Sequence, residues 1–589
     1  MDIEKNYLRW CERANGDPDL SAELAAMAGK PELIEDAFYR ELEFGTGGLR
    51  GVIGAGTNRM NIYTVGKASQ GLANYVIAHF PPEKRRIAVS YDSRIKSDLF
   101  SQVAAGVFAA NGIEVRIYPQ LMPTPCLSFA VRELDCAAGI MVTASHNPSK
   151  YNGYKVYGPD GCQITTKAAK AILAEIDRID AFDDVRCMEF EEGLREGRIR
   201  KIGDEVLTCF IAEVKKQSVL YDAPADRSAA IIYTPLNGTG LVPVLRTLRE
   251  AGYSNITVVA EQEKPDGHFP TCPYPNPEIH EAMALGMEYA RREQADLLMA
   301  TDPDCDRIGI AVRNAEGEYV LLTGNETGML LLDYICQRRL AAGTMPKDPV
   351  MVKTIVTIDM AERIAAHYGV RTVNVLTGFK FIGEQIGLLE KKGCQDSYIM
   401  GFEESYGYLT GTYVRDKDAV NGAFMIAEMF AYYRARGVGL LDRLAELYQE
   451  YGYCHNTLHS YEFDGSAGFE RMKAIMAAFR TCGERIGKFR VTELLDYSQG
   501  VDGLPKSDVL KFRFEGNRSL VVRPSGTEPK LKCYLSVSAA DAEAAEAVEK
   551  ELHACVNTII EEAGSHSGVH RAEPSLSFDK EEHDDDSAN

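Results

Sequence analysis

Three apolar, strand-like segments of the chain each end abruptly in a short polar loop, and this repeated pattern restricts the possible folds most. The segments are Ala138–Val142, Asp296–Ala300 and Ser397–Met400. Helical and strand patterns alternate around each of them, as βαβ units require. Because ligands of open α/β sheets bind beyond the carboxyl ends of strands, we expect the three loops to border one site.

The C-terminal part of the chain has a different pattern. Three strand-like runs over Val509–Phe514, Ser519–Arg523 and Leu531–Leu535 precede an Ala/Glu-rich helical stretch over Asp541–Glu562. This order predicts an α+β module. After Gly564 the chain becomes polar and acidic, which is typical of a disordered tail.

The length fits this division, because at roughly 150 residues per domain the 589 residues suggest about four domains. We predict an α/β protein with four domains around a central cleft. Three are related α/β domains with mixed sheets in three layers, and the fourth is α+β. The predicted limits are 1–207, 208–323, 324–440 and 441–564, followed by the tail over 565–589.

The charge balance excludes some classes of partner. The chain has 65 Lys and Arg against 86 Asp and Glu, a formal charge of −21, which argues against binding to nucleic acid or an anionic membrane. No apolar run approaches the roughly 18 residues of a membrane span, and Met1–Lys5 begins no signal peptide. The 14 cysteines are scattered without zinc spacing, so we expect reduced thiols and a cytoplasmic protein.

The loop after the second segment carries Asp302, Asp304 and Asp306. In a flat strand the outer two would lie roughly 13 Å apart, so sharing one cation requires the bend that Pro303 favours. Magnesium suits carboxylates with phosphate or water oxygens. An EF-hand is excluded, because its Gly and Glu positions hold Arg307 and Arg313. An aspartyl-nucleophile phosphatase and a solvated acidic turn remain alternatives.

The loop after the first segment offers a hydroxyl at Ser145, and Lys155 follows at a distance that allows it to return to the same site. A serine nucleophile needs a nearby base or metal, and the alternative is a turn or N-cap serine. Two further loops suit phosphate: Gly45–Gly51, with Arg50, and Arg523–Lys530. The Walker A and G-x-G-x-x-G spacings are absent, so nucleotide binding is not supported.

Together these loops resemble the α-D-phosphohexomutase superfamily, from Phe44 to Tyr534. Thr143–Pro148 is similar to its phosphoserine loop, Asp302–Arg307 to its magnesium loop, Gly401–Ser405 to its sugar loop and Arg523–Thr527 to its phosphate-binding loop. The stretches Phe44–Arg50 and Asn152–Tyr157 are similar to the long-chain branch, which holds bacterial α-phosphoglucomutases and the animal phosphoglucomutase-2/phosphopentomutase enzymes.

The resemblance implies a role for each matching residue. Ser145 would carry the phosphoryl group, with a phosphate oxygen completing a Mg²⁺ site made by the three aspartates. His146, Lys155, Arg50 and Arg307 would act in the transfer, and Thr377, Gly378, Glu403 and Ser405 would bind the sugar. The implied phosphate contacts are Thr46, Lys380, Lys417, Arg523, Ser525, Gly526 and Thr527.

The implied reaction interconverts glucose 1-phosphate and glucose 6-phosphate, with glucose 1,6-bisphosphate as intermediate and activator and small phosphorylated sugars as the partners. At the positions of Cys305, Phe379 and Tyr406, other members of the family have different residues. Phe379 and Tyr406 belong to the part of the site that the resemblance assigns to sugar binding. Phosphomannomutase, phosphopentomutase and glucose-1,6-bisphosphate synthase are therefore alternatives. A magnesium-dependent sugar-phosphate phosphatase and an inactive binding protein are alternatives of other classes. The sequence leaves the oligomeric state open.

Overall fold

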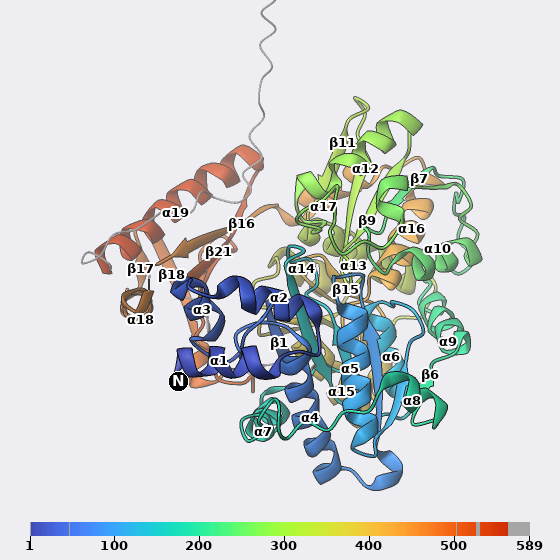
Figure 1. The fold of residues 1–589 in the computed structure, drawn as a ribbon. Helices are drawn as coiled ribbons and strands as arrows, with labels where there is room; N and C mark the ends of the chain where they lie inside the picture. The colour runs from blue at the N-terminus through green and yellow to red at the C-terminus, as the bar shows by residue number, and fades with distance from the viewer. Residues whose placement is uncertain (1, 46, 464, 502, 526–529, 564–589) are drawn as a thin grey trace, which may run out of the picture. The chain divides into compact units, whose positions relative to one another are not determined.

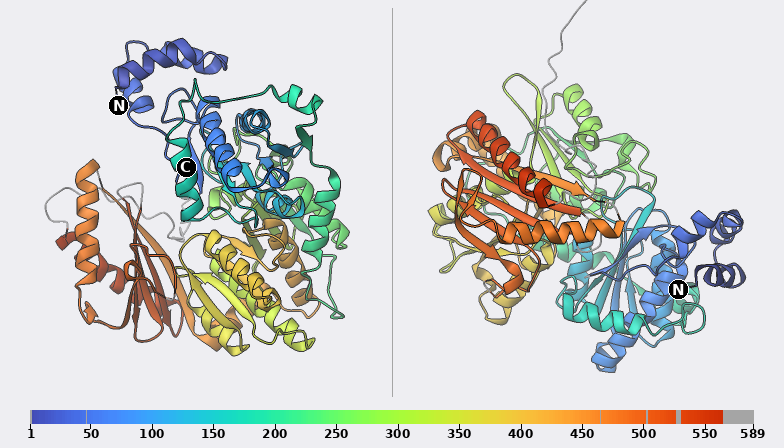
Figure 2. Two further views of the ribbon diagram at one scale, coloured as in Figure 1. Left: turned by 90° about the horizontal axis from the view of Figure 1, so that it is seen from below. Right: turned by 90° about the vertical axis from the view of Figure 1, so that its left-hand side faces the viewer.

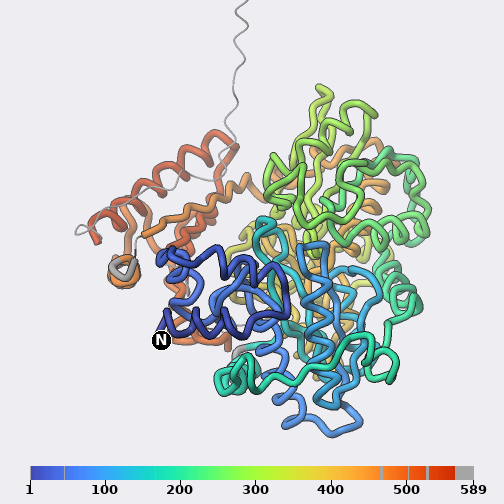
Figure 3. Tube along the Cα trace, viewed as in Figure 1, coloured from blue at the N-terminus to red at the C-terminus, as the bar shows by residue number. Residues whose placement is uncertain are grey.

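The computed structural model describes residues 2–45, 47–463, 465–501, 503–525 and 530–563. The chain forms two compact units, which we describe separately: residues 1–354 with 365–443, and residues 355–364 with 444–589. The first unit holds three mixed sheets and the second holds one antiparallel sheet. Each sheet is built from one continuous stretch of chain and therefore has its own range of colours (Figures 1 and 3).

The chain begins with three helices that the sequence analysis did not predict. They are α1 (Ile3–Arg13), α2 (Pro18–Met27) and α3 (Pro31–Phe38). Trp10 lies edge-on to Phe38, Tyr63 and Phe182, with ring centroids 5.4 to 5.8 Å apart. These helices therefore have a small aromatic core of their own beside the first sheet.

The first sheet has the strand order β1-β5-β4-β2-β3-β6, with β2, β3, β4 and β6 parallel and β1 and β5 antiparallel to their neighbours. Its elements are β1 (Gly48–Val52), α4 (Ile62–His79), β2 (Arg86–Tyr91), α5 (Ser97–Ala110), β3 (Glu114–Ile117), α6 (Thr124–Glu133), β4 (Ala138–Val142), β5 (Tyr151–Tyr157), α7 (Thr166–Ile176), α8 (Phe190–Arg195) and β6 (Ile199–Lys201).

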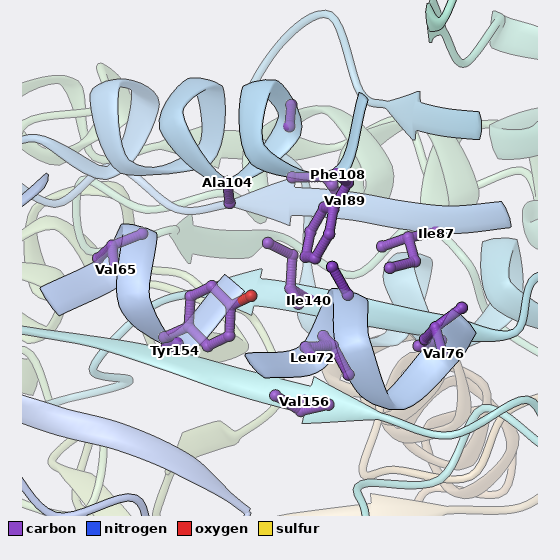
Figure 4. Close-up of a cluster of buried hydrophobic side chains, with 14 of the residues drawn as sticks. Val65, Leu72, Val76, Ile87, Val89, Ala104, Phe108, Ile140, Tyr154 and Val156 are labelled. Carbon is purple, nitrogen blue, oxygen red and sulfur yellow. The ribbon is translucent and has the colours of Figure 1, made fainter. Parts of the chain in front are cut away.

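The core of this domain forms between the sheet and its helices. Figure 4 shows Leu72 and Val76 of α4 and Phe108 of α5 against strand residues such as Val89 and Ile140, all almost fully buried. Burial of each such side chain contributes about 1.5–3 kcal/mol to folding. This packing holds β4 and β5, the strands on either side of the Ser145 loop.

The second sheet has the order β11-β10-β9-β7-β8, and the third has the order β13-β12-β14-β15. Around the second lie α9 (Asp204–Lys215), β7 (Ile231–Thr234), α10 (Leu241–Glu250), β8 (Ile256–Val258), α11 (Ala260–Glu263), α12 (His280–Glu293), β9 (Leu297–Thr301), β10 (Ile308–Arg313) and β11 (Tyr319–Leu322). Around the third lie α13 (Gly324–Ala341), β12 (Val350–Thr354), β13 (Arg371–Val375), α15 (Phe379–Lys391), β14 (Tyr398–Glu403), β15 (Gly407–Leu409) and α16 (Ala419–Arg434). The residues of α14 (Met360–His367) are divided between the two units.

The three sheets share one local design. A strand with a parallel neighbour (β4, β9 or β14) turns into an antiparallel return strand (β5, β10 or β15). The connecting loop holds a non-glycine residue at positive φ in each case: Ser145 at 54°, Cys305 at 49° and Tyr406 at 62°. The expectation of three related α/β domains is confirmed, and the three polar loops are equivalent positions of one repeated motif.

Two details of the prediction are wrong. The segment from Gly48 to Gly51 is not an open glycine loop, because it forms most of β1 and pairs with β5, with Arg50 opposite Gly153. The polar loop of the third domain starts later than expected, since β14 continues through Glu403. In both places, residues that the sequence pattern assigned to a loop pair with a neighbouring strand of the sheet.

The second unit contains the antiparallel sheet β16-β21-β20-β19-β18-β17, with α18 and α19 across one face (Figure 2). Its elements are α17 (Leu440–Tyr451), β16 (Tyr453–Glu462), α18 (Gly465–Arg480), β17 (Arg485–Ile486), β18 (Phe489–Asp496), β19 (Leu510–Phe514), β20 (Arg518–Pro524), β21 (Lys530–Ala539) and α19 (Ala542–Ala563). The predicted α+β domain is confirmed. The predicted acidic tail lies outside the described residues. Among the residues described, no helix is long and apolar enough to cross a membrane.

Candidate active site

The Ser145 loop connects β4 to β5 and places the serine in an unusual backbone conformation. Ser145 is 4% exposed and its φ of 54° lies in the left-handed region, which costs a non-glycine residue roughly 1–2 kcal/mol. Its N–H donates to Thr143 Oγ1 over 2.8 Å. The turn directs the hydroxyl away from its own domain, and Ser145 Oγ donates to Asp302 Oδ2 of the second domain over 2.9 Å.

The second loop bends at Pro303, as expected from the sequence, and the bend brings three buried carboxylates together. Asp302, Asp304 and Asp306 are each 0% exposed, and one oxygen of each lies within 4.8 Å of the others. Asp302 organises the turn, because its Oδ1 accepts the N–H groups of Asp306 and Arg307 at 3.1 and 3.0 Å. Thr124 of α6 donates its hydroxyl to Asp304 Oδ2 over 2.9 Å, which joins the first and second domains.

Two largely buried lysines, with side chains 13% and 11% exposed, partly neutralise this cluster. Lys155 Nζ of β5 lies 2.8 Å from Asp304 Oδ2, and Lys417 Nζ lies 2.8 Å from Asp306 Oδ2. Burial alone would lower the pKa of both lysines, but the aspartates raise it above the ordinary value. Burial and the two neighbouring carboxylates raise the pKa of Asp302 well above its usual range. The two lysines therefore pair with Asp304 and Asp306, whereas Asp302 bonds to Ser145.

The donor set fits a hard divalent cation. Oδ1 of Asp304 and Oδ1 of Asp306 are buried and accept no hydrogen bond from the described part of the chain. A buried carboxylate oxygen without a partner is costly, and a cation would satisfy it. Mg²⁺ prefers oxygen ligands of this kind. The acidic cluster is therefore consistent with a metal ion.

His146 lies beside the serine, and Arg50 and Arg307 are close enough to His146 to affect its ionisation. His146 Nδ1 is 3.4 Å from Ser145 Oγ, and burial together with Arg307 and Arg50 lowers the pKa of His146 well below its usual range. Arg50 Nη1 lies 3.5 Å from Asn147 Oδ1. Arg307 Nη1 donates to Glu278 Oε1 over 2.8 Å, a partner that the sequence analysis did not identify. The region next to the hydroxyl is thus lined by cationic groups.

The third loop joins the same region through its backbone and through Glu403. The C=O of Tyr406 accepts the N–H of Ile308, the first residue of β10, over 3.1 Å. Glu403 is 4% exposed, and burial raises its pKa to about 7 despite Lys417 and Arg307 nearby. Ser405, two residues after Glu403, is partly exposed. The structure therefore brings the third loop beside the second.

The remaining predicted contacts lie on other elements. Thr377 and Gly378 precede α15, Gly378 at φ 115°, and Thr377 Oγ1 is buried without a hydrogen-bond partner among the described residues. Lys380 lies in the first turn of α15, and its C=O accepts the thiol of Cys162. Arg523 is the next-to-last residue of β20 in the second unit, where the Ser525 N–H donates to the Lys530 carbonyl over 2.7 Å. Thr46, Gly526 and Thr527 lie outside the described residues.

The sequence analysis missed several residues that support this site. Asp416 accepts a 2.7 Å hydrogen bond from Tyr157 and lies beside Lys417, its Oδ1 3.5 Å from Lys417 Nζ. Arg94 donates to the backbone of the Ser145 loop. Asp92 and Arg94 directly follow the apolar strand β2, so the strand-then-polar-loop pattern that identified the other loops applies here as well.

Comparison with known families gives matches along most of the chain. The models described as phosphoglucomutase/phosphomannomutase alpha/beta/alpha domains I, II and III match residues 41–183, 209–317 and 323–451, and the C-terminal domain of the same family matches residues 470–554. The four matches follow one another in the order of the sheets described above.

Individual relatives are similar over nearly their whole length. A phosphoglucomutase of Staphylococcus saprophyticus is 36% identical over 514 residues, which is 85% of this chain and 91% of that protein. A phosphoglucomutase of Staphylococcus aureus is 35% identical over 540 residues, 90% of this chain and 95% of that protein.

Solved structures share the fold at lower identity. A putative phosphomannomutase from Thermus thermophilus is 21% identical, with a TM-score of 0.66 over 88% of this chain and 99% of that one. The Paramecium phosphoprotein pp63/parafusin, a phosphoglucomutase, is 17% identical, with a TM-score of 0.69 over 91% of this chain and 98% of that one. The chain therefore belongs to the phosphoglucomutase/phosphomannomutase family of the α-D-phosphohexomutase superfamily and is an enzyme, a phosphohexomutase.

Proposed function

We propose that the enzyme interconverts glucose 1-phosphate and glucose 6-phosphate through a phosphoserine at Ser145. The observation that carries this proposal is the 2.9 Å contact between Ser145 Oγ and the buried Asp302 carboxylate. A serine aimed at a buried acidic cluster suits a nucleophile whose phosphate completes a metal site. The phosphoglucomutase relatives favour glucose as the sugar.

In the first transfer, the bond between phosphorus and Ser145 Oγ breaks and a new bond forms to a hydroxyl oxygen of the sugar monophosphate. The hydroxyl proton passes to a base, and His146 and Lys155 are the candidates for the general acid and base of the transfers. The product, glucose 1,6-bisphosphate, reorients and returns its other phosphoryl group to Ser145. Arg50 and Arg307 offer positive charge beside the transferring group, as phosphoryl transfer requires.

The proposed metal ligands are Asp302, Asp304, Asp306 and an oxygen on Ser145. A bound Mg²⁺ would neutralise negative charge that develops on the phosphoryl oxygens. The two buried carboxylate oxygens that accept no hydrogen bond from the described residues, Oδ1 of Asp304 and Oδ1 of Asp306, support this assignment.

The resemblance to the family supports further contacts to the sugar and to phosphate. Glu403 and Ser405, with Thr377 and Gly378, would hold sugar hydroxyls, and Lys380 and Lys417 would contact phosphate. For the phosphate that does not react we propose Arg523, Ser525, Gly526 and Thr527, with Thr46 as a further contact. The mixture of guanidinium, hydroxyl and flexible backbone in this segment is suited to an oxyanion.

Intact-mass measurement tests the proposal. The wild-type protein incubated with glucose 1,6-bisphosphate should gain one phosphoryl group, and Ser145→Ala should gain none and lose mutase activity. A magnesium-dependent phosphatase that uses Asp302 as nucleophile would instead keep its hydrolytic activity in Ser145→Ala and lose it in Asp302→Ala. An inactive binding protein would show no adduct in any variant. A coupled assay with glucose, mannose, ribose and deoxyribose 1-phosphates then identifies the sugar.

We also propose the domain limits 1–207, 208–323, 324–440 and 441–564, which separate the four sheets. The cysteines are free thiols, and this supports the proposal of a reducing compartment, the cytoplasm.

A further inference from the structure

The side chain of Arg94 lies beneath the Ser145 loop and donates hydrogen bonds to its backbone. Arg94 Nη2 donates to the carbonyl oxygens of Ser145 and Asn147, and Nη1 donates to those of Pro148 and Tyr151 at 3.0 Å each. The guanidinium thus holds four carbonyls between the serine and the first residue of β5. A planar fork with five N–H donors suits this arrangement, whereas a lysine ammonium has three donors from one point.

Arg94 is itself fixed from three sides. Its side chain and that of Asp92 are both 0% exposed, and Arg94 Nε lies 3.4 Å from Asp92 Oδ2. Asp92 Oδ1 accepts the N–H of Arg94 and the hydroxyl of Ser97 at 2.9 and 2.8 Å. The guanidinium carbon lies 5.1 Å from the ring centre of Phe269, a residue of the second domain. A buried charge with these partners is held in one position.

The contact with the second domain is close. A Cβ on Gly267 would lie 2.4 Å from the backbone nitrogen of Ile95 and 2.7 Å from the carbonyl oxygen of Ser93, so the backbones approach as only glycine allows. The segment that carries Phe269 therefore rests directly on the backbone around Arg94. Arg94 lies between the loop that carries the serine and the domain that carries the aspartates.

The carbonyl of Ser145 is part of the peptide unit whose orientation sets where the side chain points. Ser145 has a left-handed backbone, which is unfavourable by itself and persists only where its surroundings hold it. The bonds from Arg94 hold that peptide unit and the two turns after it. The direction of Ser145 Oγ toward Asp302 depends on this support.

We propose that Arg94 is a positioning residue, which fixes the backbone of the Ser145 loop so that Ser145 Oγ faces the acidic cluster. This inference rests on the proposed function of Ser145. Within the Ser145 loop, the hydrogen bonds of Arg94 go only to backbone carbonyls, so it acts on phosphoryl transfer through Ser145 and leaves substrate binding largely unchanged. Errors of about 1 Å in the placement of a reacting group can cost roughly 100-fold in rate.

The test compares Arg94→Lys and Arg94→Met with a matched control, Arg85→Lys. Arg85 also donates to backbone carbonyls of the first domain, those of Phe80 and Ile77 at 3.0 and 2.9 Å, but it lies after α4 and outside the site. Three quantities are measured per folded molecule: the rate of Ser145 phosphorylation by glucose 1,6-bisphosphate, and kcat and KM for glucose 1-phosphate. Hydrogen exchange of residues 143–151 reports the order of the loop.

We expect Arg94→Lys to lower the phosphorylation rate and kcat by about 10- to 100-fold, with KM changed less than about 3-fold. In Arg94→Lys, hydrogen exchange of residues 143–151 should become faster than in the wild type. Arg94→Met should have a lower rate of phosphoryl transfer than Arg94→Lys. Arg85→Lys should keep its kcat. If Arg94→Met does not fold, Arg94→Lys and a further variant, Phe269→Leu, test the proposal. We expect Phe269→Leu to lose less kcat than Arg94→Lys.

Two failures can be told apart. If the wild-type protein takes no phosphoryl group on Ser145, the proposed function is wrong. If the wild-type protein is phosphorylated while Arg94→Lys matches Arg85→Lys in kcat and in loop exchange, Arg94 is only structural and this inference is wrong. An increase in KM with kcat unchanged would also overturn it, because it would assign Arg94 to substrate binding.

Discussion

The ammonium group of Lys417 lies 2.8 Å from Oδ2 of Asp306 and joins the third domain to the acidic cluster of the second. The same lysine follows Asp416, which accepts a hydrogen bond from Tyr157 of β5. Lys155, two residues before Tyr157 on the same face of β5, pairs with Asp304. The three α/β domains are thus linked around the cluster by alternating positive and negative side chains.

This arrangement predicts how Lys417 affects metal binding. An ammonium group beside Asp306 competes with a divalent cation for the same carboxylate. Lys417→Met should therefore raise the Mg²⁺ affinity of the dephosphorylated protein by about 3- to 30-fold, or about 0.7–2 kcal/mol. The variant should also unfold at a lower temperature without Mg²⁺, because three buried carboxylates then face one lysine. Calorimetric titration and thermal unfolding measure the two effects, and weaker Mg²⁺ binding would contradict the prediction.

The backbone at Gly238 gives a second prediction for the metal site. A Cβ at this position would lie 2.4 Å from Cα and 2.6 Å from the carbonyl oxygen of Pro303, in the loop that carries the aspartates. Gly238→Ala should displace this loop, lower Mg²⁺ affinity about tenfold and destabilise the fold by about 1–3 kcal/mol. Gly387 in α15 is the control, because a Cβ there meets no atom within 4 Å. Gly387→Ala should leave Mg²⁺ binding unchanged and stabilise the helix by up to about 1 kcal/mol. Equal Mg²⁺ affinities would show that the loop tolerates the added methyl group.

The sequence predicts those parts of the site in which the residues that act together are neighbours in the chain. The carboxylates of Asp302, Asp304 and Asp306 follow one strand, and a single bend brings them together, so their spacing alone indicates a cation site. Ser145 is identified in the same way from the strand before it. The hydrophobic pattern of each strand makes the three α/β domains predictable from local sequence, although β14 continues three residues beyond its predicted end at Met400.

The contacts between domains could not be predicted, because they join residues that are remote in the chain and individually ordinary. Thr124 begins a helix, Tyr157 ends a strand and Glu278 lies in a loop. The sequence around each of them gives no indication of the residue that it contacts. The N-terminal helices were missed for a related reason. Trp10 finds its aromatic neighbours at Tyr63 and Phe182, which belong to the first α/β domain.

Tyr157 tests the strength of one such contact between domains. Its hydroxyl donates to the carboxylate of Asp416 over 2.7 Å, and both groups are buried. Tyr157→Phe should destabilise the protein by about 1.5–3 kcal/mol, because a buried carboxylate oxygen loses its donor. In Tyr154→Phe the lost bond is to the neutral hydroxyl of Ser69 at 3.0 Å, so the cost should be about 0.5–1.5 kcal/mol. Urea unfolding compares the two variants, and equal losses would contradict the distinction between the charged and the neutral partner.

Glu390 of α15 predicts a pH dependence of stability away from the catalytic residues. Its carboxylate lies 2.8 Å from Arg132 of α6 and 2.7 Å from the buried Arg415. Hydrogen bonding by Arg132, against some burial and together with the charge of Arg415, lowers the pKa of Glu390 to about 2 from an ordinary value of 4.5. The ionised carboxylate therefore stabilises the folded state fully above about pH 4.5, and this contribution is lost as the pH falls toward 2.

Glu390→Gln should lower the free energy of unfolding at pH 7, and the deficit should shrink as the pH is reduced below 4.5. Because the Glu390 side chain is 44% exposed, solvent screens the pairs, and we expect a loss of only about 0.5–1.5 kcal/mol at pH 7. Urea unfolding at pH 7, 4 and 3 measures the difference from wild type. Glu133→Gln, an exposed position in the last turn of α6, serves as the control and should show no deficit at any of these pH values. A deficit for Glu390→Gln that stays constant from pH 7 to pH 3 would mean that the side chain stabilises by packing and not by its charge.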